Sequence, residues 1–302
     1  MNRILINGQC MDASAAVVSV MDHGFLYGMG LFETFRTYGG RPFLLERHWA
    51  RLIEGCKTLG IDVSALPDAL QLRGWIAELM QANGLKEAYV RYTVSAGEDA
   101  LGLPAGMYSR PNSVLMAKPL PEPAPALYTH GKPLKLLSTQ RNSPEGPVRL
   151  KSLHYMNNIL AKRELSSDPE AVRLHAEGLM LNADGYLSEG IVSNVFFAKN
   201  GKIHTPDTAC GLLPGITRGL VLELASGAGI SCEEGFYNWE DLRQADEVWL
   251  TTSIQELVPV TSLIDPNGTV LIIGEGRIGP LTDILLRLYR QQTGGYHEND
   301  DL

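Results

Sequence analysis

The stretch Lys151-Ser-Leu-His-Tyr-Met-Asn-Asn158 lies where an extended, proline-interrupted segment gives way to residues with helical spacing. Residues 142–150 contain two prolines, and the apolar positions after Lys151 are typical of the first turns of a helix. A lysine at such a junction can be partly desolvated, which lowers the pKa of its amine and makes it a usable nucleophile for an aldehyde. Most lysines are solvated surface charges, so this interpretation of Lys151 needs further context.

Three later segments contain the other groups that an aldehyde cofactor needs. An acid is present in Leu187-Ser-Glu-Gly190. Hydroxyl side chains are present in Thr251-Thr-Ser-Ile-Gln-Glu256, at the end of a segment that looks like a buried strand. Leu213-Pro-Gly-Ile-Thr-Arg218 precedes an apolar run and predicts a helix N-terminus, whose free amides and positive dipole end suit a phosphate. Pyridoxal phosphate requires a lysine, an acid for its ring nitrogen and a phosphate site. Taken singly, each segment also has a plain structural explanation, such as a proline-led helix start.

The order of these motifs resembles the fold-type IV pyridoxal-phosphate enzymes. The motifs are K-S-L-x-Y-x-N-N-I-L-A-K from Lys151, S-E-G-x-x-S-N-x-F from Ser188, L-P-G-I-T-R from Leu213 and T-x-S-x-x-E-x-x-P from Thr251. That group contains branched-chain aminotransferases, D-amino-acid aminotransferases and 4-amino-4-deoxychorismate lyases. The resemblance implies a mixed α/β (α+β) fold of two domains, with pyridoxal 5'-phosphate in the cleft between them. It also implies a homodimer.

The resemblance assigns three residues to the cofactor ring. Lys151 would form the covalent link to the cofactor and then shuttle protons. Glu189 would face the pyridine nitrogen and keep it protonated, so that the ring withdraws electrons effectively. Tyr155 would hydrogen-bond the phenolic oxygen of the ring.

A second set of residues would hold the phosphate. Arg51 lies in the segment His48-x-x-Arg51-Leu52, which matches a family motif whose arginine binds the phosphate. Without the resemblance, Arg51 would be read as a surface arginine of a helix, and His48 as a packed or capping imidazole. The remaining residues of the cofactor site are Asn194, which would support its wall, together with Ile216, Thr217, Thr252 and Ser253.

Residues that would face the substrate favour a lyase. Phe32-Glu33-Thr34 resembles the pattern of the 4-amino-4-deoxychorismate lyases, in which the threonine hydroxyl assists proton transfer, so Thr34 is expected to be catalytic. The turn at 252–256 resembles some bacterial lyases as well. Phe32, Arg91 and Ile254 are therefore expected to contact the substrate, with the guanidinium of Arg91 suited to a carboxylate. The expected reaction eliminates pyruvate and gives 4-aminobenzoate, a step of folate biosynthesis.

Two transaminase activities remain as alternatives. The first is a branched-chain aminotransferase, because residues 151–162 resemble some of those enzymes closely, although His154 replaces their common asparagine. A D-amino-acid aminotransferase is less favoured. Its hairpin tyrosine and its later arginine are replaced here by Phe32 and Ala96.

Bulk composition indicates an ordinary globular protein. The chain has 302 residues, of which 44% are hydrophobic and 20% are charged, and its formal net charge is -8. This charge disfavours nucleic acid or an anionic membrane as the main partner, so a small-molecule substrate is expected. We expect no membrane span, no signal peptide and no metal site. The four cysteines show no paired spacing, which favours reduced thiols in the cytoplasm.

A proline-rich stretch at 118–125 suggests a domain boundary. The expected division is an N-terminal α/β domain at 1–118, a linker at 119–132 and a C-terminal α/β domain at 133–302 that carries Lys151. Alternation at 31–38, followed by Gly39-Gly40, predicts a hairpin. A strand is predicted at 16–20 and a frayed acidic tail at 294–302.

Overall fold

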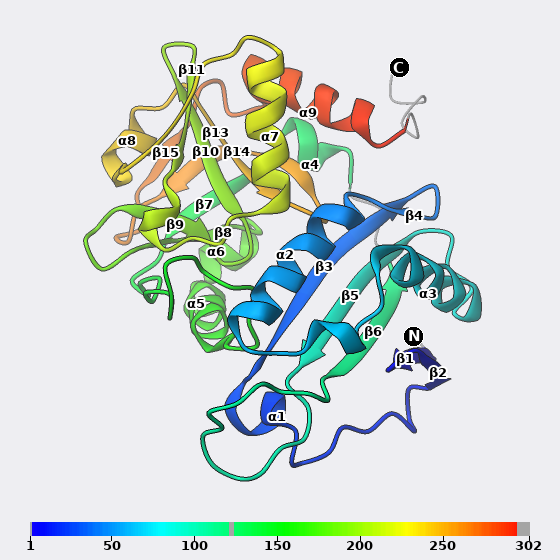
Figure 1. Cartoon of the computed structure of the whole chain (residues 1–302). Coiled ribbons are helices and arrows are strands. Elements are labelled where there is room, and N and C mark those ends of the chain that lie inside the picture. Colours follow the sequence, from blue (N-terminus) through cyan, green and yellow to red (C-terminus); the bar gives the residue numbers. More distant parts are fainter. Residues whose placement is uncertain (1, 121–123, 295–302) are drawn as a thin grey trace. The chain divides into compact units, whose positions relative to one another are not determined.

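The computed structural model describes residues 2–120 and 124–294, which form two compact units (Figure 1). The first unit lies within Met1–Pro121 and also takes in Leu150–His154, and the second lies within Glu122–Arg149 and Tyr155–Leu302. Each unit is a mixed α/β structure with its own sheet. Among the described helices, none combines the length and the apolar character that crossing a membrane requires.

The first unit is built on a six-stranded sheet with the order β2-β1-β6-β5-β3-β4, in which every neighbouring pair is antiparallel. Its strands are β1 (Arg3–Ile6), β2 (Gln9–Asp12), β3 (Gly30–Tyr38), β4 (Arg41–Pro42), β5 (Ala88–Ser95) and β6 (Asn112–Pro119). Its helical segments are α1 (His23–Tyr27), α2 (Leu45–Thr58), η1 (Val63–Ala65) and α3 (Ala69–Ala82).

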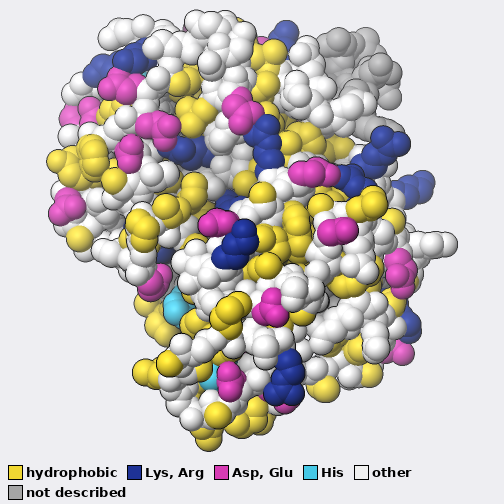
Figure 2. Space-filling model, in the orientation of Figure 1, with side chains coloured by type: hydrophobic (Ala, Val, Ile, Leu, Met, Phe, Trp, Pro, Cys, Tyr) yellow, Lys and Arg dark blue, Asp and Glu magenta, His cyan; other side chains and the backbone are white. Residues whose placement is uncertain are grey.

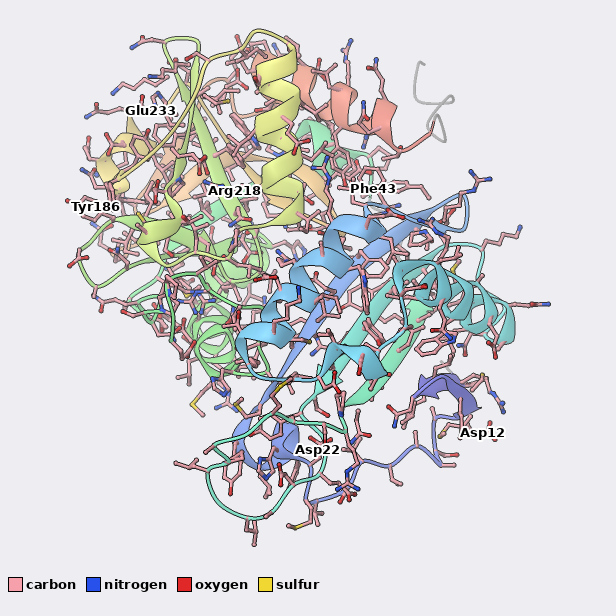
Figure 3. The ribbon with its side chains drawn as sticks, in the orientation of Figure 1. Asp12, Asp22, Phe43, Tyr186, Arg218 and Glu233 are labelled. Atoms are coloured by element: carbon pink, nitrogen blue, oxygen red, sulfur yellow. The ribbon has the colours of Figure 1, made fainter. Side chains whose placement is uncertain are left out.

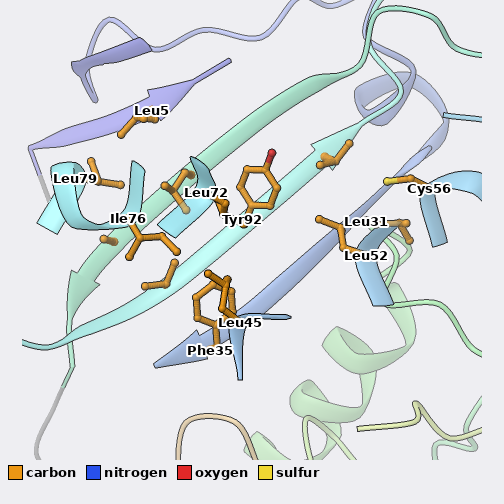
Figure 4. Packing of buried hydrophobic residues seen from close by; sticks show 14 of the residues in the cluster. Leu5, Leu31, Phe35, Leu45, Leu52, Cys56, Leu72, Ile76, Leu79 and Tyr92 are labelled. Carbon is orange, nitrogen blue, oxygen red and sulfur yellow. The ribbon is translucent and has the colours of Figure 1, made fainter. Parts of the chain in front are cut away.

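Helices α2 and α3 cover one face of this sheet with apolar side chains. Leu31 and Phe35 alternate along β3 and meet Leu45 and Leu52 of α2, while Tyr92 of β5 lies in the same cluster (Figure 4). Because successive side chains of a strand point to opposite faces, the residues between these core positions lie on the other face of the sheet. Phe32, Thr34 and Arg91 belong to that other face.

The segment 150–154 joins the first unit through β3. The backbone amide of Phe32 donates to the carbonyl of Lys151 at 2.9 Å, and the amide of Leu153 donates to the carbonyl of Gly30 at 3.0 Å. Leu150 packs against the apolar cluster beneath α2. The division of the chain therefore differs from the expected boundaries, because Lys151 belongs to the first unit while the residues on both sides of this segment belong to the second.

The second unit contains a nine-stranded mixed sheet with the order β12-β11-β10-β13-β14-β7-β8-β9, to which β15 is added beside β14. The pairs β11–β12, β14–β7 and β7–β8 are parallel, and the other pairs are antiparallel. Its strands are β7 (Lys132–Leu136), β8 (Glu177–Leu181), β9 (Leu187–Gly190), β10 (Asn194–Lys199), β11 (Lys202–Pro206), β12 (Cys232–Gly235), β13 (Glu247–Thr252), β14 (Glu256–Ile264) and β15 (Val270–Ile272).

Helices flank this second sheet. They are α4 (Ala126–Thr129), α5 (Met156–Ser166), α6 (Pro169–Arg173), η2 (Thr208–Cys210), α7 (Ile216–Gly227), α8 (Trp239–Arg243) and α9 (Pro280–Gln292). Ala161 and Leu165 of α5 pack with Met180 of β8.

Several predicted elements are confirmed and one is wrong. The hairpin after residue 31 forms, although its second strand is only Arg41–Pro42 because α2 begins at Leu45. The predicted strand at 16–20 is absent from this described segment, which has no strand partner despite its valines. The prediction of a frayed tail at 294–302 falls almost wholly outside the described residues.

Candidate functional site

A buried carboxylate in the first unit holds two side chains of α2. Glu33 of β3 accepts hydrogen bonds from Arg51 Nε and Nη2 at 2.8 and 2.7 Å, and from His48 Nδ1 at 2.6 Å. Glu33 and His48 are each 2% exposed. Burial alone would raise the pKa of Glu33, but the charge of Arg51 and the hydrogen bond from His48 outweigh it and lower this pKa to about 2. Burial also lowers the pKa of His48.

The other face of the first sheet carries Phe32, Thr34 and Arg91. Thr34 of β3 lies directly opposite Arg91 of β5 in the antiparallel ladder, so the two side chains share a face. The guanidinium of Arg91 stacks over the ring of Phe32, with its carbon 3.6 Å from the ring centroid. The structure therefore brings together three residues that the sequence assigned to substrate binding and proton transfer.

Lys151 joins this group. Its Nζ lies 4.7 Å from the centroid of the Phe32 ring, and its carbonyl accepts the hydrogen bond from the Phe32 amide. The side chain of Lys151 is half-buried, and Phe32 is 2% exposed. The same aromatic ring thus contacts the amine of Lys151 and the guanidinium of Arg91.

In the second unit, Glu189 lies buried on β9. Its Oε1 accepts a hydrogen bond from Arg141 Nε at 2.7 Å, and its Oε2 accepts one from the backbone amide of Leu213 at 3.0 Å. Nε of a second arginine, Arg149, lies 4.0 Å from Oε1. A buried carboxylate with charged partners remains a hydrogen-bond acceptor, which is what a protonated ring nitrogen requires.

Sequence reasoning missed Arg141 and Arg149. The partner of Arg141 is Glu189, 48 residues further along the chain, and Arg149 bonds Gly211, 62 residues further along. The one available signal was the concentration of Arg141, Arg149 and Lys151 within eleven residues, and this signal is weak because most arginines are exposed.

Helix α7 begins at Ile216, and its N-cap residue is Gly215, which has no side chain with which to cap the helix. The Nδ2 of Asn194 donates to the carbonyl of Leu213 at 2.8 Å and so holds the loop that precedes the helix. Arg218, labelled on α7 in Figure 3, donates to the carbonyl of Pro206 at 2.9 Å and anchors the first turn to β11. The amides of this first turn are therefore held in place by contacts on either side of them.

Hydroxyl groups lie beside this helix start. The Oγ1 of Thr217 and the Oγ of Ser253 are 3.4 Å apart. Thr252 has a different arrangement, because its Oγ1 accepts hydrogen bonds from the amides of Ile254 at 3.2 Å and Gln255 at 2.8 Å. Thr252 therefore shapes the turn that carries Ser253 and Ile254.

The remaining predicted residues also lie at element ends. Tyr155 is the residue before α5, where its carbonyl accepts a hydrogen bond from the amide of Ile159 at 3.1 Å, and its side chain is half-buried. Ile216 is the first residue of α7. Within the described residues, His, Cys, Asp and Glu side chains form no group of three or more that could hold a metal ion.

The donor set fits pyridoxal 5'-phosphate. The first unit offers the amine of Lys151, and the second offers a buried carboxylate at Glu189 and an uncapped helix N-terminus beside two hydroxyls. Gly215 is fitted tightly, since a Cβ there would lie 2.0 Å from Oδ1 of Asn194. A Cβ here would therefore displace Asn194, which holds the loop leading to the amides of this helix N-terminus.

Comparisons with known proteins identify the family of this chain. The profile of the amino-transferase class IV family matches residues 30–263. An aminodeoxychorismate lyase of Bacillus subtilis is 39% identical over 291 residues, which are 96% of this chain and 94% of that protein. Two similar solved structures are a 4-amino-4-deoxychorismate lyase from Pseudomonas aeruginosa and a branched-chain aminotransferase from Escherichia coli.

The two solved structures resemble this chain over nearly its whole length. The lyase is 31% identical with a TM-score of 0.80, and the similarity covers 95% of this chain and 98% of that one. The aminotransferase is 29% identical with a TM-score of 0.83, and the similarity covers 99% and 97%. The fold and the pyridoxal-phosphate chemistry expected from the motifs are therefore confirmed, and the chain belongs to the class IV aminotransferase family.

Proposed function

We propose that this protein is a 4-amino-4-deoxychorismate lyase that depends on pyridoxal 5'-phosphate. It would convert its substrate into pyruvate and 4-aminobenzoate, a precursor of folate. The 39% identity with the Bacillus subtilis lyase over 96% of the chain supports this proposal. The observation that carries it is the pairing of Thr34 with Arg91 on the face of the sheet that also holds Phe32 and Lys151.

Lys151 and Thr34 are the two catalytic groups of the proposal. The cofactor, when bound, withdraws electrons from the amine-bearing carbon of the substrate. Lys151 would hold the cofactor covalently, and its Nζ, once freed when the substrate amine displaces it, would take the proton from that carbon. The hydroxyl of Thr34 assists this transfer by forming a hydrogen bond with the group that moves the proton. Since elimination yields an aromatic product, positioning and proton transfer are the main tasks left to the protein.

Arg91, Phe32 and Ile254 bind the substrate in this proposal. The planar guanidinium of Arg91 stacks on Phe32 at 3.6 Å, which fixes its plane and orients its donors for a carboxylate. The ring of Phe32 lies beside the amine of Lys151, whose Nζ is 4.7 Å from the ring centroid. Ile254 contributes apolar surface from the turn after β13.

The proposed cofactor site has two parts. Glu189 accepts a hydrogen bond from the ring nitrogen, and the hydroxyl of Tyr155 binds the phenolic oxygen. For the phosphate we propose the amides of Ile216 and Thr217, the hydroxyls of Thr217 and Ser253, and the charge of Arg51. Asn194 and Thr252 support this part from behind, because each bonds a backbone group of the adjoining loop.

We also propose a cytoplasmic homodimer that acts on a small molecule and does not bind nucleic acid or membranes. The net charge of -8 supports this view. On the face drawn in Figure 2, lysine and arginine side chains are interspersed with aspartate and glutamate. Such a mixed surface does not favour a polyanionic partner.

The direct test is product release from enzymatically generated 4-amino-4-deoxychorismate, with no oxo acid added. Equal amounts of pyruvate and 4-aminobenzoate would support the lyase. Lys151→Ala provides the matched control, because it should bind the cofactor without a covalent link and release no product. A correctly coloured wild-type holoenzyme that forms neither product would refute the proposal.

A branched-chain aminotransferase is the second candidate. The TM-score of 0.83 with the Escherichia coli aminotransferase favours it, as does the resemblance of residues 151–162. Steady turnover of L-leucine with 2-oxoglutarate, at a rate above that of the lyase reaction, would make this activity the principal one. D-alanine serves as the comparison substrate for a D-amino-acid aminotransferase.

A further inference from the structure

Two buried arginines face a single buried carboxylate in the second unit. The side chains of Arg141, Arg149 and Glu189 are only 6 to 7% exposed. Burying an arginine is costly unless its charge is paired and its donors are satisfied. Arg141 is the arginine that hydrogen-bonds the Glu189 carboxylate directly, whereas Arg149 lies 4.0 Å from it.

Arg141 is fixed from two sides. Its Nε donates to Oε1 of Glu189 at 2.7 Å, and its Nη1 donates to Oδ1 of Asn157 at 2.7 Å. Further contacts join Nη1 to Oδ1 of Asn142 at 3.1 Å and of Asn158 at 3.4 Å. The backbone amide of Arg141 donates to the carbonyl of Leu181 at the end of β8. The guanidinium is therefore a rigid link between the start of α5 and β9.

Arg149 has a different role, since it hydrogen-bonds backbone carbonyl groups of the neighbouring loops. It donates to the carbonyl oxygens of Gly211 and Asn142, and its Nε lies 4.0 Å from Oε1 of Glu189. Burial, and after it the charge of Arg141, lowers the pKa of Arg149 to about 10, against the opposing effect of Glu189 and Glu145. Arg149 remains charged at neutral pH and adds to the positive field at Glu189.

We propose that Arg141 is a positioning residue that fixes the Glu189 carboxylate for the ring nitrogen of the cofactor. This inference rests on the proposed function only in assuming that Glu189 faces that nitrogen. Oε1 is held by Arg141 and Oε2 by the Leu213 amide, so the plane of the carboxylate is set before the cofactor binds. A carboxylate that is oriented in advance loses less entropy when it accepts the hydrogen bond from the ring N–H.

The test is a double-mutant cycle on Arg141 and Glu189. Arg141→Met, Glu189→Gln and the double variant are compared with the wild type by the dissociation constant of pyridoxal 5'-phosphate. Each single change should raise this constant by about 10- to 100-fold, as expected for loss of a hydrogen bond to a charged group. If Arg141 acts through Glu189, the double variant should lie within about twofold of the weaker-binding single variant.

Two further variants separate positioning from a structural role. Arg141→Lys keeps the charge and should restore part of the affinity. Asn157→Ala removes the acceptor on the far side of the guanidinium and should weaken binding in the same direction by a smaller factor. If Arg141→Met does not fold, Asn157→Ala tests the proposal in its place. Among active variants, kcat should fall while KM changes little, because Arg141 is not proposed to contact the substrate.

Arg290→Met is the matched control. Arg290 of α9 donates to Glu256 at 3.0 Å, and Glu256 is 1% exposed, so this change also removes an arginine from a buried carboxylate. It should leave the cofactor affinity unchanged. If the increases in the dissociation constant caused by Arg141→Met and Glu189→Gln multiply in the double variant, the two residues act independently and the proposal is wrong. An equal loss of cofactor affinity in Arg290→Met would also overturn it. The affinity measurement needs no substrate, so failure of the lyase assay alone would leave this result intact.

Discussion

Glu33 and Arg51 are joined by two hydrogen bonds from one guanidinium edge to both oxygens of one carboxylate, at 2.8 and 2.7 Å. His48, one turn earlier on α2, donates to the same carboxylate at 2.6 Å. A single side chain of β3 therefore sets the position of the arginine that we assign to the cofactor phosphate. It also anchors α2 to the sheet.

Glu33→Gln should weaken both the fold and cofactor binding. The pKa of Glu33 is lowered from 4.5 to about 2, because the charge of Arg51 and the hydrogen bond from His48 outweigh the effect of burial. Such a shift corresponds to a stabilisation on the order of 3 kcal/mol at neutral pH. Urea unfolding should detect this loss, and the dissociation constant of the cofactor should rise because Arg51 is no longer fixed.

The same carboxylate predicts a pH dependence. Because the pKa is lower in the folded state, the stabilisation is complete above pH 4.5 and disappears as the pH falls towards about 2. The stability difference between wild type and Glu33→Gln should shrink over this window. Glu46→Gln, which alters an exposed ion pair with Arg73, should change stability by less than about 1 kcal/mol. A difference for Glu33→Gln that does not vary with pH would contradict the assignment.

Thr34→Ala should slow the lyase reaction without releasing the cofactor. Thr34 lies opposite Arg91 and is assigned to proton transfer, so removing its hydroxyl should lower kcat by about 100-fold or more. Thr34→Ser retains the hydroxyl and should recover much of the rate. Formation of 4-aminobenzoate and cofactor absorbance are measured together. An Ala variant with the wild-type rate would remove Thr34 from the mechanism.

Glu247→Gln should destabilise the second unit and spare catalysis. Glu247 of β13 accepts hydrogen bonds from the amides of Leu281 and Thr282 at 2.9 Å, and so caps α9, whose N-cap residue is Gly279. Loss of the charge should cost about 1 to 3 kcal/mol of unfolding free energy, measured with urea. Glu275→Gln, at an exposed pair with Arg277, is the control. A fall in kcat of the folded variant would show that α9 has a part in the reaction.

Local patterns predicted the elements whose form depends on nearby residues. The hairpin after β3 follows from alternation and from Gly39-Gly40, both with positive φ. The start of α7 follows from the Pro-Gly pair at 214–215. The predicted strand at 16–20 shows the limit of such patterns, since its valines suit a strand but no neighbouring strand pairs with it.

Long-range contacts explain what the sequence could not reveal. Strand β14 contains Pro259, which argues against a central strand, yet β13 and β7 pair on its two sides. The motifs named Glu189, but its partner Arg141 comes from a segment 48 residues earlier. Thr252 was assigned to the cofactor from its place in a motif, whereas the structure shows its hydroxyl bonded to the turn.

The N-cap glycine of α7 and a glycine within this helix provide the sharpest test of the phosphate site. A Cβ at Gly215 would lie 2.0 Å from Oδ1 of Asn194, whereas a Cβ at Gly219 would meet nothing within 4 Å. Gly215→Ala should therefore displace Asn194, which holds the carbonyl of Leu213, and should raise the dissociation constant of the cofactor by about tenfold or more.

Gly219→Ala makes the same chemical change four residues later on α7. It should leave the cofactor affinity unchanged and stabilise the helix by about 0.5 to 1 kcal/mol, because alanine restricts the unfolded chain. Cofactor titration of the two apo-proteins, with urea unfolding in parallel, measures both effects. If Gly215→Ala binds the cofactor as tightly as Gly219→Ala, the start of α7 is not where the phosphate binds.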